Sequence, residues 1–214
     1  LAKKQAASGA IGISAATVPE VEGLVGAGIH GVLLTSPVVS SPAIARLMAA
    51  RERDSTLTAV VDNPEHATVL DRAARERGIE LDVLLDLDVG QHRTGVSPEN
   101  AAEAALFISG LPSLRFRGIQ AYAGHVQHIA GWEERRKVSL ACMEKAADAV
   151  HRIRSAGIPC EIVSGAGTGT HDIDTSLEEL SELQAGSYVL MDAEYLAIGS
   201  AGSAGFTPFV PALS

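Results

Sequence analysis

The stretch Leu81-Asp82-Val83-Leu84-Leu85-Asp86 decides the fold, because it is a short and mostly apolar run that leads straight into the polar segment 87–96. Runs of this kind are typical of parallel strands that are buried on both faces. Ser97-Pro98 follows and predicts a helix start, since serine caps helices and proline fits the first helical turn. The stretch therefore predicts one strand followed by one helix.

The same unit recurs along the chain, with a helix start after each strand and a glycine where the helix should stop. The seven predicted strands are Ala10–Ile13, Gly31–Leu34, Leu57–Val61, Leu81–Asp86, Phe116–Tyr122, Glu161–Val163 and Ser187–Met191. The predicted helix starts are Thr17, Ser41, Asn63, Ser97 and Thr175, and the predicted helix ends are Gly28, Gly78, Gly110 and Gly157.

Strands that alternate with helices, without hairpin signals between them, indicate right-handed βαβ units and a parallel α/β fold. The strands repeat about every 30 residues, which is the spacing of a (β/α)₈ TIM-type barrel. Such a barrel needs eight strands, and Leu1–Gly9 reads as the end of a helix whose own strand is missing. We therefore expect an incomplete barrel with about seven of its eight units. An open doubly wound sheet stays the alternative, since periodicity alone does not close a sheet.

Composition excludes several classes of protein. The chain has 214 residues, of which 46% are hydrophobic, and this is too apolar for intrinsic disorder. The formal charge of −9 disfavours binding to nucleic acid or to an anionic membrane surface. The sequence contains no apolar run long enough for a membrane span and no signal peptide core, so we expect a soluble, cytoplasmic protein. Two cysteines, Cys142 and Cys160, predict reduced thiols.

The candidate site should lie at the carboxyl ends of the strands, where barrels and open sheets both bind their ligands. The loop Ser164–Thr170 has three glycines and two threonines, a composition suited to holding a phosphate with backbone and hydroxyl donors. It follows the penultimate predicted strand, where barrels often bind phosphate. A flexible glycine-rich turn is the structural alternative.

Three further segments are candidates for the site. Two of them follow predicted strands, and the third leads into the last predicted strand. Arg93 in the segment Asp86–Gly95 is suited to binding an oxyanion or tuning a cofactor ring, whereas Asp86 or Asp88 could simply form a salt bridge with an arginine. The segment Gln120–His128 carries Tyr122, His125 and His128 at one strand end, and a metal site there is a minority interpretation. In Glu182–Asp192, Gly186 and Ser187 are placed to approach the same phosphate, or to form a plain turn.

Taken together, these four segments resemble one family in order and spacing, the D-threonine aldolase and D-serine dehydratase group. Its members are fold-type III pyridoxal 5′-phosphate (PLP) enzymes with a barrel similar to the N-terminal domain of alanine racemase. The resemblance spans residues 1–214 as one PLP-binding domain. It implies that Gly167, Thr168, Gly169, Thr170, Gly186 and Ser187 hold the cofactor phosphate, that Tyr122 lies beside the cofactor, and that Arg93 approaches its ring oxygen.

The resemblance also shows what the chain lacks. The family's Schiff-base lysine lies at the end of the first strand, upstream of Leu1, so Lys3 and Lys4 are not its equivalents and no catalytic residue is assigned here. A C-terminal β-domain, which carries the divalent-metal ligands in the family, is also missing, so no metal ligand is assigned. At Ala166 the family's loop has another glycine. The resemblance further implies a homodimer for the full-length protein.

We therefore expect the parent protein to be a PLP-dependent lyase that acts on small D-configured β-hydroxy amino acids, and this chain to be an inactive fragment of it. Retro-aldol cleavage would release glycine and an aldehyde, and β-elimination would release water. An amino-acid racemase of the alanine racemase kind and a non-catalytic PLP-binding protein are the alternatives. A sugar-phosphate enzyme that shares only the phosphate loop is a third.

Overall fold

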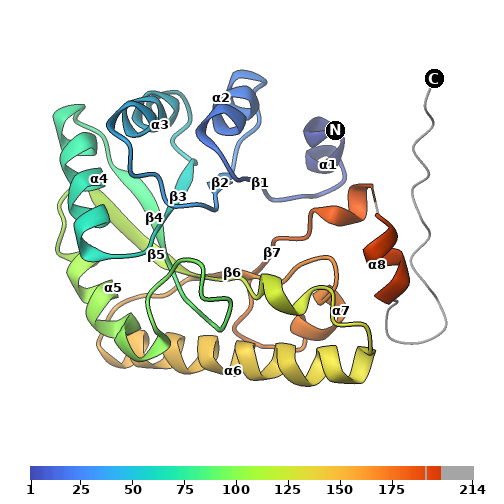
Figure 1. Ribbon diagram of the computed structural model, residues 1–214. Helices are drawn as coiled ribbons and strands as arrows, with labels where there is room; N and C mark the ends of the chain where they lie inside the picture. The colour runs from blue at the N-terminus through green and yellow to red at the C-terminus, as the bar shows by residue number, and fades with distance from the viewer. Residues whose placement is uncertain (191, 199–214) are drawn as a thin grey trace, which may run out of the picture.

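The computed structural model describes residues 1–190 and 192–198, and in them seven parallel strands form one curled sheet with helices on its outer side (Figure 1). The strands pair in chain order. They are β1 (Ile13–Ala15), β2 (Val32–Leu34), β3 (Thr58–Val61), β4 (Leu81–Asp86), β5 (Leu114–Ala121), β6 (Ile162–Gly165) and β7 (Glu182–Leu183). The helices are α1 (Ala2–Ala7), α2 (Val18–Gly26), α3 (Ser41–Arg53), α4 (Pro64–Glu76), α5 (Ala101–Ser109), α6 (Trp132–Ser155), α7 (His171–Asp174) and α8 (Ala193–Ile198), with 3₁₀ turns η1 (Pro98–Asn100), η2 (Gly124–Val126) and η3 (Ser187–Val189).

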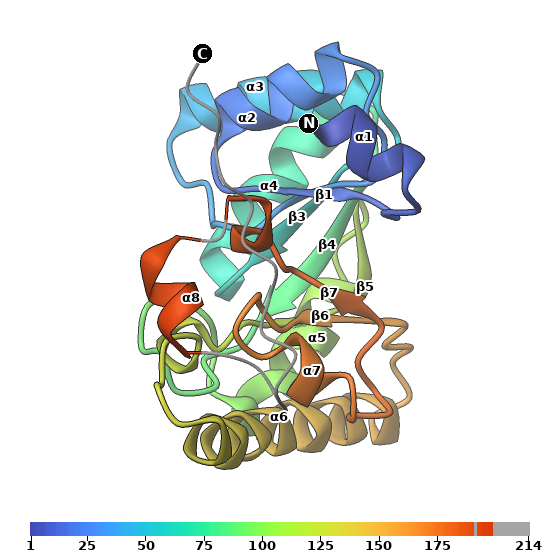
Figure 2. The same ribbon diagram turned by 90° about the vertical axis from the view of Figure 1, so that its right-hand side faces the viewer.

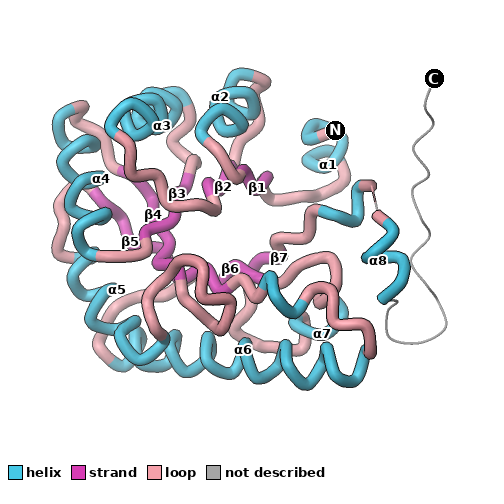
Figure 3. The backbone as a smooth tube through the Cα atoms, in the orientation of Figure 1, coloured by secondary structure: helices cyan, strands magenta, loops and turns pink. Residues whose placement is uncertain are grey.

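The predicted fold class, an incomplete (β/α)₈ barrel, is confirmed. A doubly wound sheet reverses its strand order at a switch point, whereas here the order runs from β1 to β7 without reversal. The strands form an arc, and its open side lies between β1 and β7 (Figure 3). The view onto that open side shows the two end strands apart (Figure 2). The seven strands therefore form a barrel wall with one gap.

The sheet is buried on both faces, as the apolar strand runs predicted. Successive strand residues point to opposite faces, so Leu34 packs outward among the helices while its neighbour Leu33 packs inward. The inward cluster is small and consists of Leu33, Val60 and Leu84 with Ile162 against it. The larger cluster lies between the sheet and the helices. Each fully buried leucine in it contributes roughly 1.5–3 kcal/mol.

A β-bulge in β5 determines which of its side chains face the interior. Val83 of β4 is opposite Phe116 and Leu84 is opposite Gly118, so Arg117 is an extra residue in β5. After the bulge, Gln120 is opposite Asp86. An unbroken strand would instead continue the alternation and point Gln120 outward. The bulge therefore places a polar side chain inside the barrel at the carboxyl end of the strands.

Two predicted strands lie elsewhere. The first strand is Ile13–Ala15 rather than Ala10–Ile13. Before it, the backbone at Gly12 passes so close to Gly31 O that a Cβ there would be 2.0 Å from it. The last strand is Glu182–Leu183, and the prediction of a strand at Ser187–Met191 is wrong, since Ser187–Val189 form η3. The apolar run there is exposed, with Leu190 64% accessible. Met191 lies outside the described residues.

Most predicted helix boundaries are confirmed, and one is wrong. Thr17 and Asn63 cap α2 and α4 through their side chains. Thr175 ends α7 instead of starting a helix. Gly110 follows the last residue of α5 as predicted, although its φ of −81° is not left-handed. Gly28, Gly78 and Gly157 do adopt positive φ after their helices.

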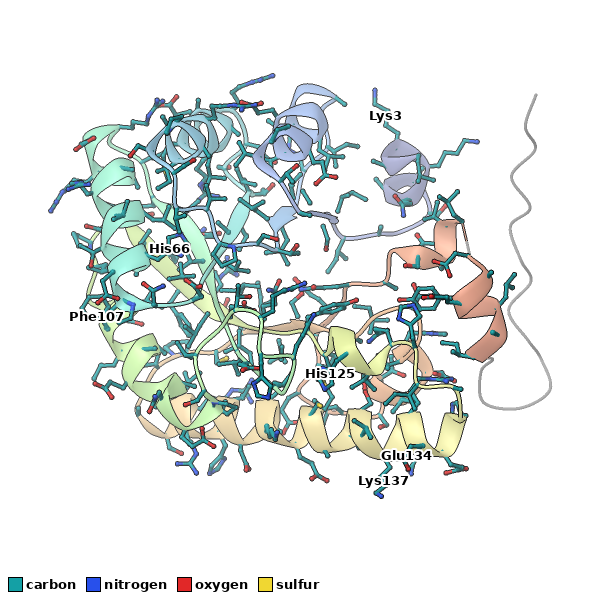
Figure 4. All side chains as sticks on the ribbon, in the orientation of Figure 1. Lys3, His66, Phe107, His125, Glu134 and Lys137 are labelled. Carbon is teal, nitrogen blue, oxygen red and sulfur yellow. The ribbon has the colours of Figure 1, made fainter. Side chains whose placement is uncertain are left out.

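Residues Leu1–Gly9 contain the predicted helix end, observed as α1. Lys3 and Lys4 are exposed on it, and Lys3 points away from the sheet (Figure 4). The structure thus gives neither lysine a place at the carboxyl ends of the strands. Among the described helices, none is long and apolar enough to cross a membrane.

The bulge yields a stability test. A Cβ at Gly118, which has φ +152°, would be 1.9 Å from Ile162 O in the neighbouring strand, so Gly118→Ala should lower the free energy of unfolding by about 2–4 kcal/mol. Gly23 in α2 has open space around it, and Gly23→Ala should raise the free energy of unfolding by up to about 1 kcal/mol. Urea unfolding followed by circular dichroism measures both. Equal effects of the two substitutions would contradict the role assigned to the bulge.

Candidate functional site

The four predicted segments all lie at the carboxyl ends of the strands. Leu87 follows β4, Tyr122 follows β5, Ala166 follows β6 and Gln184 follows β7. Because parallel strands end at the same edge of a sheet, the segments gather on one face of the barrel. The backbone connects them there, since Leu87 N donates to Gln120 O over 2.9 Å and Gln184 N donates to Gly165 O over 2.8 Å.

Arg93 and Tyr122 lie together at a small cavity of about 10 Å³, which Asp86 and Gln91 also line. Burial raises the pKa of Tyr122, and the Arg93 charge partly opposes this rise. Arg93 has no hydrogen-bond or ion-pair partner among the described residues. An arginine without a partner beside a half-buried phenol is suited to a ligand oxyanion.

Beneath this group, polar side chains cross the interior of the barrel. Gln120 Nε2 donates to Asp86 Oδ1 over 2.8 Å and to Thr35 O over 3.1 Å. Gln184 Nε2 donates to Gln120 Oε1 over 3.1 Å and to Ser164 Oγ over 3.0 Å. The carboxyl ends of β2, β4, β5, β6 and β7 are thereby joined by Gln120 and Gln184, to which the sequence analysis assigned no role.

Asp86 is the charged member of this polar layer. Its Oδ2 accepts a hydrogen bond from Thr94 Oγ1 over 2.7 Å. Burial raises the pKa of Asp86, although the bonds from Thr94 and Gln120 oppose the rise. Neither Asp86 nor Asp88 forms an ion pair with an arginine. Asp88 instead accepts hydrogen bonds from the backbone of Gly90 and His92, at 3.0 and 2.9 Å, and holds the turn that presents Arg93.

The glycine-rich loop is hydrogen-bonded within itself and to η2. Gly167 N donates to Thr170 Oγ1 over 3.2 Å, and Gly169 N donates to Gln127 Oε1 over 2.9 Å. Thr170 is completely buried and Thr168 is 2% exposed. Ala166 has φ +57°, in the left-handed region that favours glycine. The loop is therefore built as a fixed structure, in contrast to a flexible turn.

Gly186 and Ser187 border a different and larger space. They line a cavity of about 640 Å³ between the end strands, together with Ile13 of β1 and Gln5 of α1. Apart from its chain neighbours, no atom of the described residues lies within 4 Å of where a Cβ on Gly186 would be. Tyr188 N donates to Thr168 Oγ1 over 3.0 Å, so this segment is connected to the glycine-rich loop.

His125 and His128 point to different partners and do not share a site. His125 Nε2 is 3.8 Å from Cys142 Sγ. His128 packs against Tyr195 of α8 with ring centroids 4.4 Å apart and ring planes tilted by 53°, and its Nε2 is 3.6 Å from Glu194 Oε2. Within residues 1–190 and 192–198, no group of three histidine, cysteine or acidic side chains is arranged to hold a metal.

Sequence reasoning missed the buried amides Gln120 and Gln127 and the half-buried amide Gln184. A signal for Gln120 was present, because it is the single polar side chain in the apolar run Gly118–Ala121. Gln127 and Gln184 lie in loops, where a polar residue is expected in any case. Nothing in the sequence distinguished them from solvated side chains.

Comparisons with known proteins identify the family of this chain. The family model for the alanine racemase N-terminal domain matches residues 1–194. A D-threonine aldolase of Arthrobacter sp. is 37% identical over 91% of this chain and 52% of its own length. A 3-hydroxy-D-aspartate aldolase of Paracoccus denitrificans is 34% identical over 90% of this chain and 50% of its own length. The crystal structure of a D-threonine aldolase from Filomicrobium marinum has a TM-score of 0.91 at 32% identity, and covers 94% of this chain and 55% of the other.

Fold and site together define a parallel barrel of the alanine racemase N-terminal kind. The chain belongs to the alanine racemase N-terminal domain family, and its resemblance to the D-threonine aldolase group is confirmed. It spans about half the length of the curated relatives that it matches.

The cysteines give a test of the site's chemistry. Burial raises the pKa of Cys142, and it raises the pKa of Cys160 to about 11. Burial also lowers the pKa of His125, so the pair of Cys142 with His125 does not favour a thiolate. In the folded protein at pH 8, iodoacetamide should modify neither cysteine at a rate comparable to that in urea. Mass spectrometry over time measures this, and fast alkylation of folded Cys142 would contradict the assignment.

Proposed function

We propose that this chain is most of the cofactor barrel of a PLP-dependent lyase, and that the complete enzyme acts on D-configured β-hydroxy amino acids. The observation that carries the proposal is the pair of built features on one face of the barrel, an unpartnered arginine beside Tyr122 and a rigid glycine-rich loop. The names of the relatives supply the substrate class, since they include D-threonine aldolase and 3-hydroxy-D-aspartate aldolase.

The described residues fit PLP chemically. A phosphorylated aromatic cofactor needs hydrogen-bond donors at one end and polar or aromatic contacts at the ring. The hydroxyl proton of Thr168 has no acceptor among the described residues, although the side chain is 2% exposed. Arg93 likewise has a free guanidinium group. Thr168 and the Gly186–Ser187 backbone would hold the phosphate, and Arg93 and Tyr122 would contact the ring.

Bound PLP supplies an electron-accepting ring, which lowers the barrier to breaking a bond at Cα or next to it. The residues of this chain orient and screen that ring. Arg93 would hold an oxyanion on the ring, as its position beside the half-buried Tyr122 allows. Asp86 would keep Arg93 in place through its charge and through Thr94.

His128 lies on this face of the barrel and contacts α8. We assign His128 to proton transfer at the substrate hydroxyl. It is half exposed and has Glu194 and Tyr195 beside it. His125 is a poorer candidate, because it packs against Cys142 and its pKa is lowered by burial. Retro-aldol cleavage and β-elimination both need a proton moved at that hydroxyl, so this assignment does not choose between aldolase and dehydratase.

The complete protein would contribute one more strand and a further domain. The cavity of about 640 Å³ lies between β1 and β7, where an eighth parallel strand would close the barrel. That strand would carry the cofactor lysine at its carboxyl end. A divalent metal, bound by the C-terminal β-domain, and a homodimer complete the proposal. The present chain alone should then have no lyase activity.

The position of the lysine can be tested directly. The sequence encoded before Leu1 should contain an apolar strand that ends in lysine. Borohydride treatment of the complete PLP-loaded protein should attach the cofactor to that lysine, because it alone would reach the barrel gap. Peptide mapping by mass spectrometry identifies the modified residue. Attachment to Lys3 or Lys4 that is required for activity would refute the proposal.

The activity itself needs a separate experiment. The complete protein should convert D-threonine or D-3-hydroxyaspartate and leave the L-isomers unchanged, with glycine as the product of an aldolase and ammonia with a 2-oxo acid as the products of a dehydratase. Arg93→Gln should lower kcat/KM at least about tenfold, through loss of a charge-assisted hydrogen bond of roughly 1.5–3 kcal/mol.

The control for that experiment is Lys137→Gln, because Lys137 is exposed on the outer face of α6 (Figure 4). It removes one positive charge from the protein without touching the site, so kcat/KM should stay unchanged. Lack of turnover of any D-β-hydroxy amino acid by the PLP-loaded protein would overturn the proposed function.

A further inference from the structure

Gln127 joins the glycine-rich loop to the segment that carries Tyr122. The side chain is 1% exposed. Its Oε1 accepts from Gly169 N over 2.9 Å, and its Nε2 donates to Thr170 Oγ1 over 3.0 Å and to Ala123 O over 3.3 Å. Both amide protons and the amide oxygen are therefore engaged, and the orientation of the amide is determined by its partners.

The bonds of Gln127 occupy groups that would otherwise be donors to a ligand. Thr170 Oγ1 accepts from both Gln127 and Gly167 N, so its own proton must point elsewhere. The proton points toward Asp174, which is completely buried. Burial raises the pKa of Asp174, and hydrogen bonds from the hydroxyls of Ser139 and Thr170 oppose that rise. The Thr170 hydroxyl and the Gly169 N–H are therefore used within the protein.

Two of the three glycines in the loop are explained by the same residue. A Cβ on Gly167 would be 2.3 Å from Gln127 Oε1, and a Cβ on Gly169 would be 2.2 Å from Gln127 O. Any larger residue would collide with Gln127 or force it away. The glycines thus allow the close approach of Gln127, whatever room they also leave for a ligand.

We propose that Gln127 is a positioning residue for the cofactor phosphate, because it fixes the loop so that Thr168 rather than Thr170 or the Gly169 N–H meets the phosphate. Thr168 keeps a free proton and is connected to η3 through Tyr188 N. Gln127 also contacts Ala123, the neighbour of Tyr122, so the phosphate and ring contacts form one rigid unit. This inference rests on the proposed function.

The test compares PLP with pyridoxal, which lacks the phosphate, in the complete protein. Gln127→Met keeps the side-chain length and removes the three hydrogen bonds, so PLP affinity should fall about tenfold or more while pyridoxal affinity stays within about twofold. Thr170→Val should show the same split. Hydrogen exchange at the Gly169 amide of the cofactor-free protein should become faster in Gln127→Met.

Gln127→Glu adds a pH signature that a purely structural role would not produce. The carboxylate can accept from Gly169 but cannot donate to Ala123 O, whereas a protonated carboxyl can do both. Since burial raises the pKa of a carboxyl group, PLP affinity relative to wild type should recover as the pH falls from 8 to 6. Gln127→Met should show no recovery, and the Glu variant keeps the test usable if the Met variant does not fold.

Gln91→Met is the matched control. Gln91 Oε1 accepts from Gly124 N at the ring side, over 3.3 Å, so its loss should leave the ratio of PLP to pyridoxal affinity unchanged. An unchanged ratio in Gln127→Met would overturn the inference even if the lyase is active. Binding that depends on Gln127 without any cleavage of D-β-hydroxy amino acids would overturn the proposed function and leave the inference standing.

Discussion

The bulge at Arg117 and Gly118 is the constraint on which the interior of the barrel depends. It changes the alternation of β5, so that Gln120 is opposite Asp86 inside the barrel. Without it, Asp86 would keep the hydrogen bond from Thr94 but would receive none from β5, and a buried carboxylate oxygen without a donor is costly. The bulge in turn depends on a residue without a side chain at Gly118, where β5 touches Ile162 O of β6.

Strand β4 carries two buried carboxylates on its inner face, and their partners differ in kind. Asp82, at the amino end, binds Arg115 at 2.6 Å and Arg117 at 3.2 Å. Asp86, at the carboxyl end, receives neutral donors from Thr94 and Gln120, and its pKa is raised by burial. The amino end of the barrel thus neutralises its charge with arginine, whereas at the carboxyl end Arg93 remains available to a ligand. This division follows the general pattern of barrels, in which the amino face supports stability and the carboxyl face supports function.

The regular part of this fold could be predicted from the sequence because periodicity reports burial. Leu81–Asp86 is buried throughout and was located to the residue. The same argument failed at Tyr188–Leu190, where an apolar run is exposed and forms a 3₁₀ turn. An apolar run on the surface looks the same in sequence as a buried one. Strand β7 has two residues, which is too few to show the alternation of a strand.

The candidate site was predictable as a set of segments but not as a set of contacts. Residue types suggested Arg93 and Tyr122, and the structure does bring them together at one cavity. Whether a hydroxyl or an N–H is free, however, depends on a partner distant in sequence, as Thr170 depends on Gln127 forty-three positions away. No pattern within a loop contains that information.

The parts of the site that would hold the two ends of a cofactor are rigid, whereas the part where the cofactor would be covalently attached is open. Hydrogen bonds fix the glycine-rich loop to Gln127 and the Arg93 turn to Asp86 and Asp88. A site organised in advance loses less conformational entropy when it binds, so more of the contact energy appears as affinity. Gln5 and Ile13, by contrast, border the open space between β1 and β7. Recognition of the cofactor and its covalent attachment are thus assigned to different parts of the barrel, and the proposed closing strand would supply only the second.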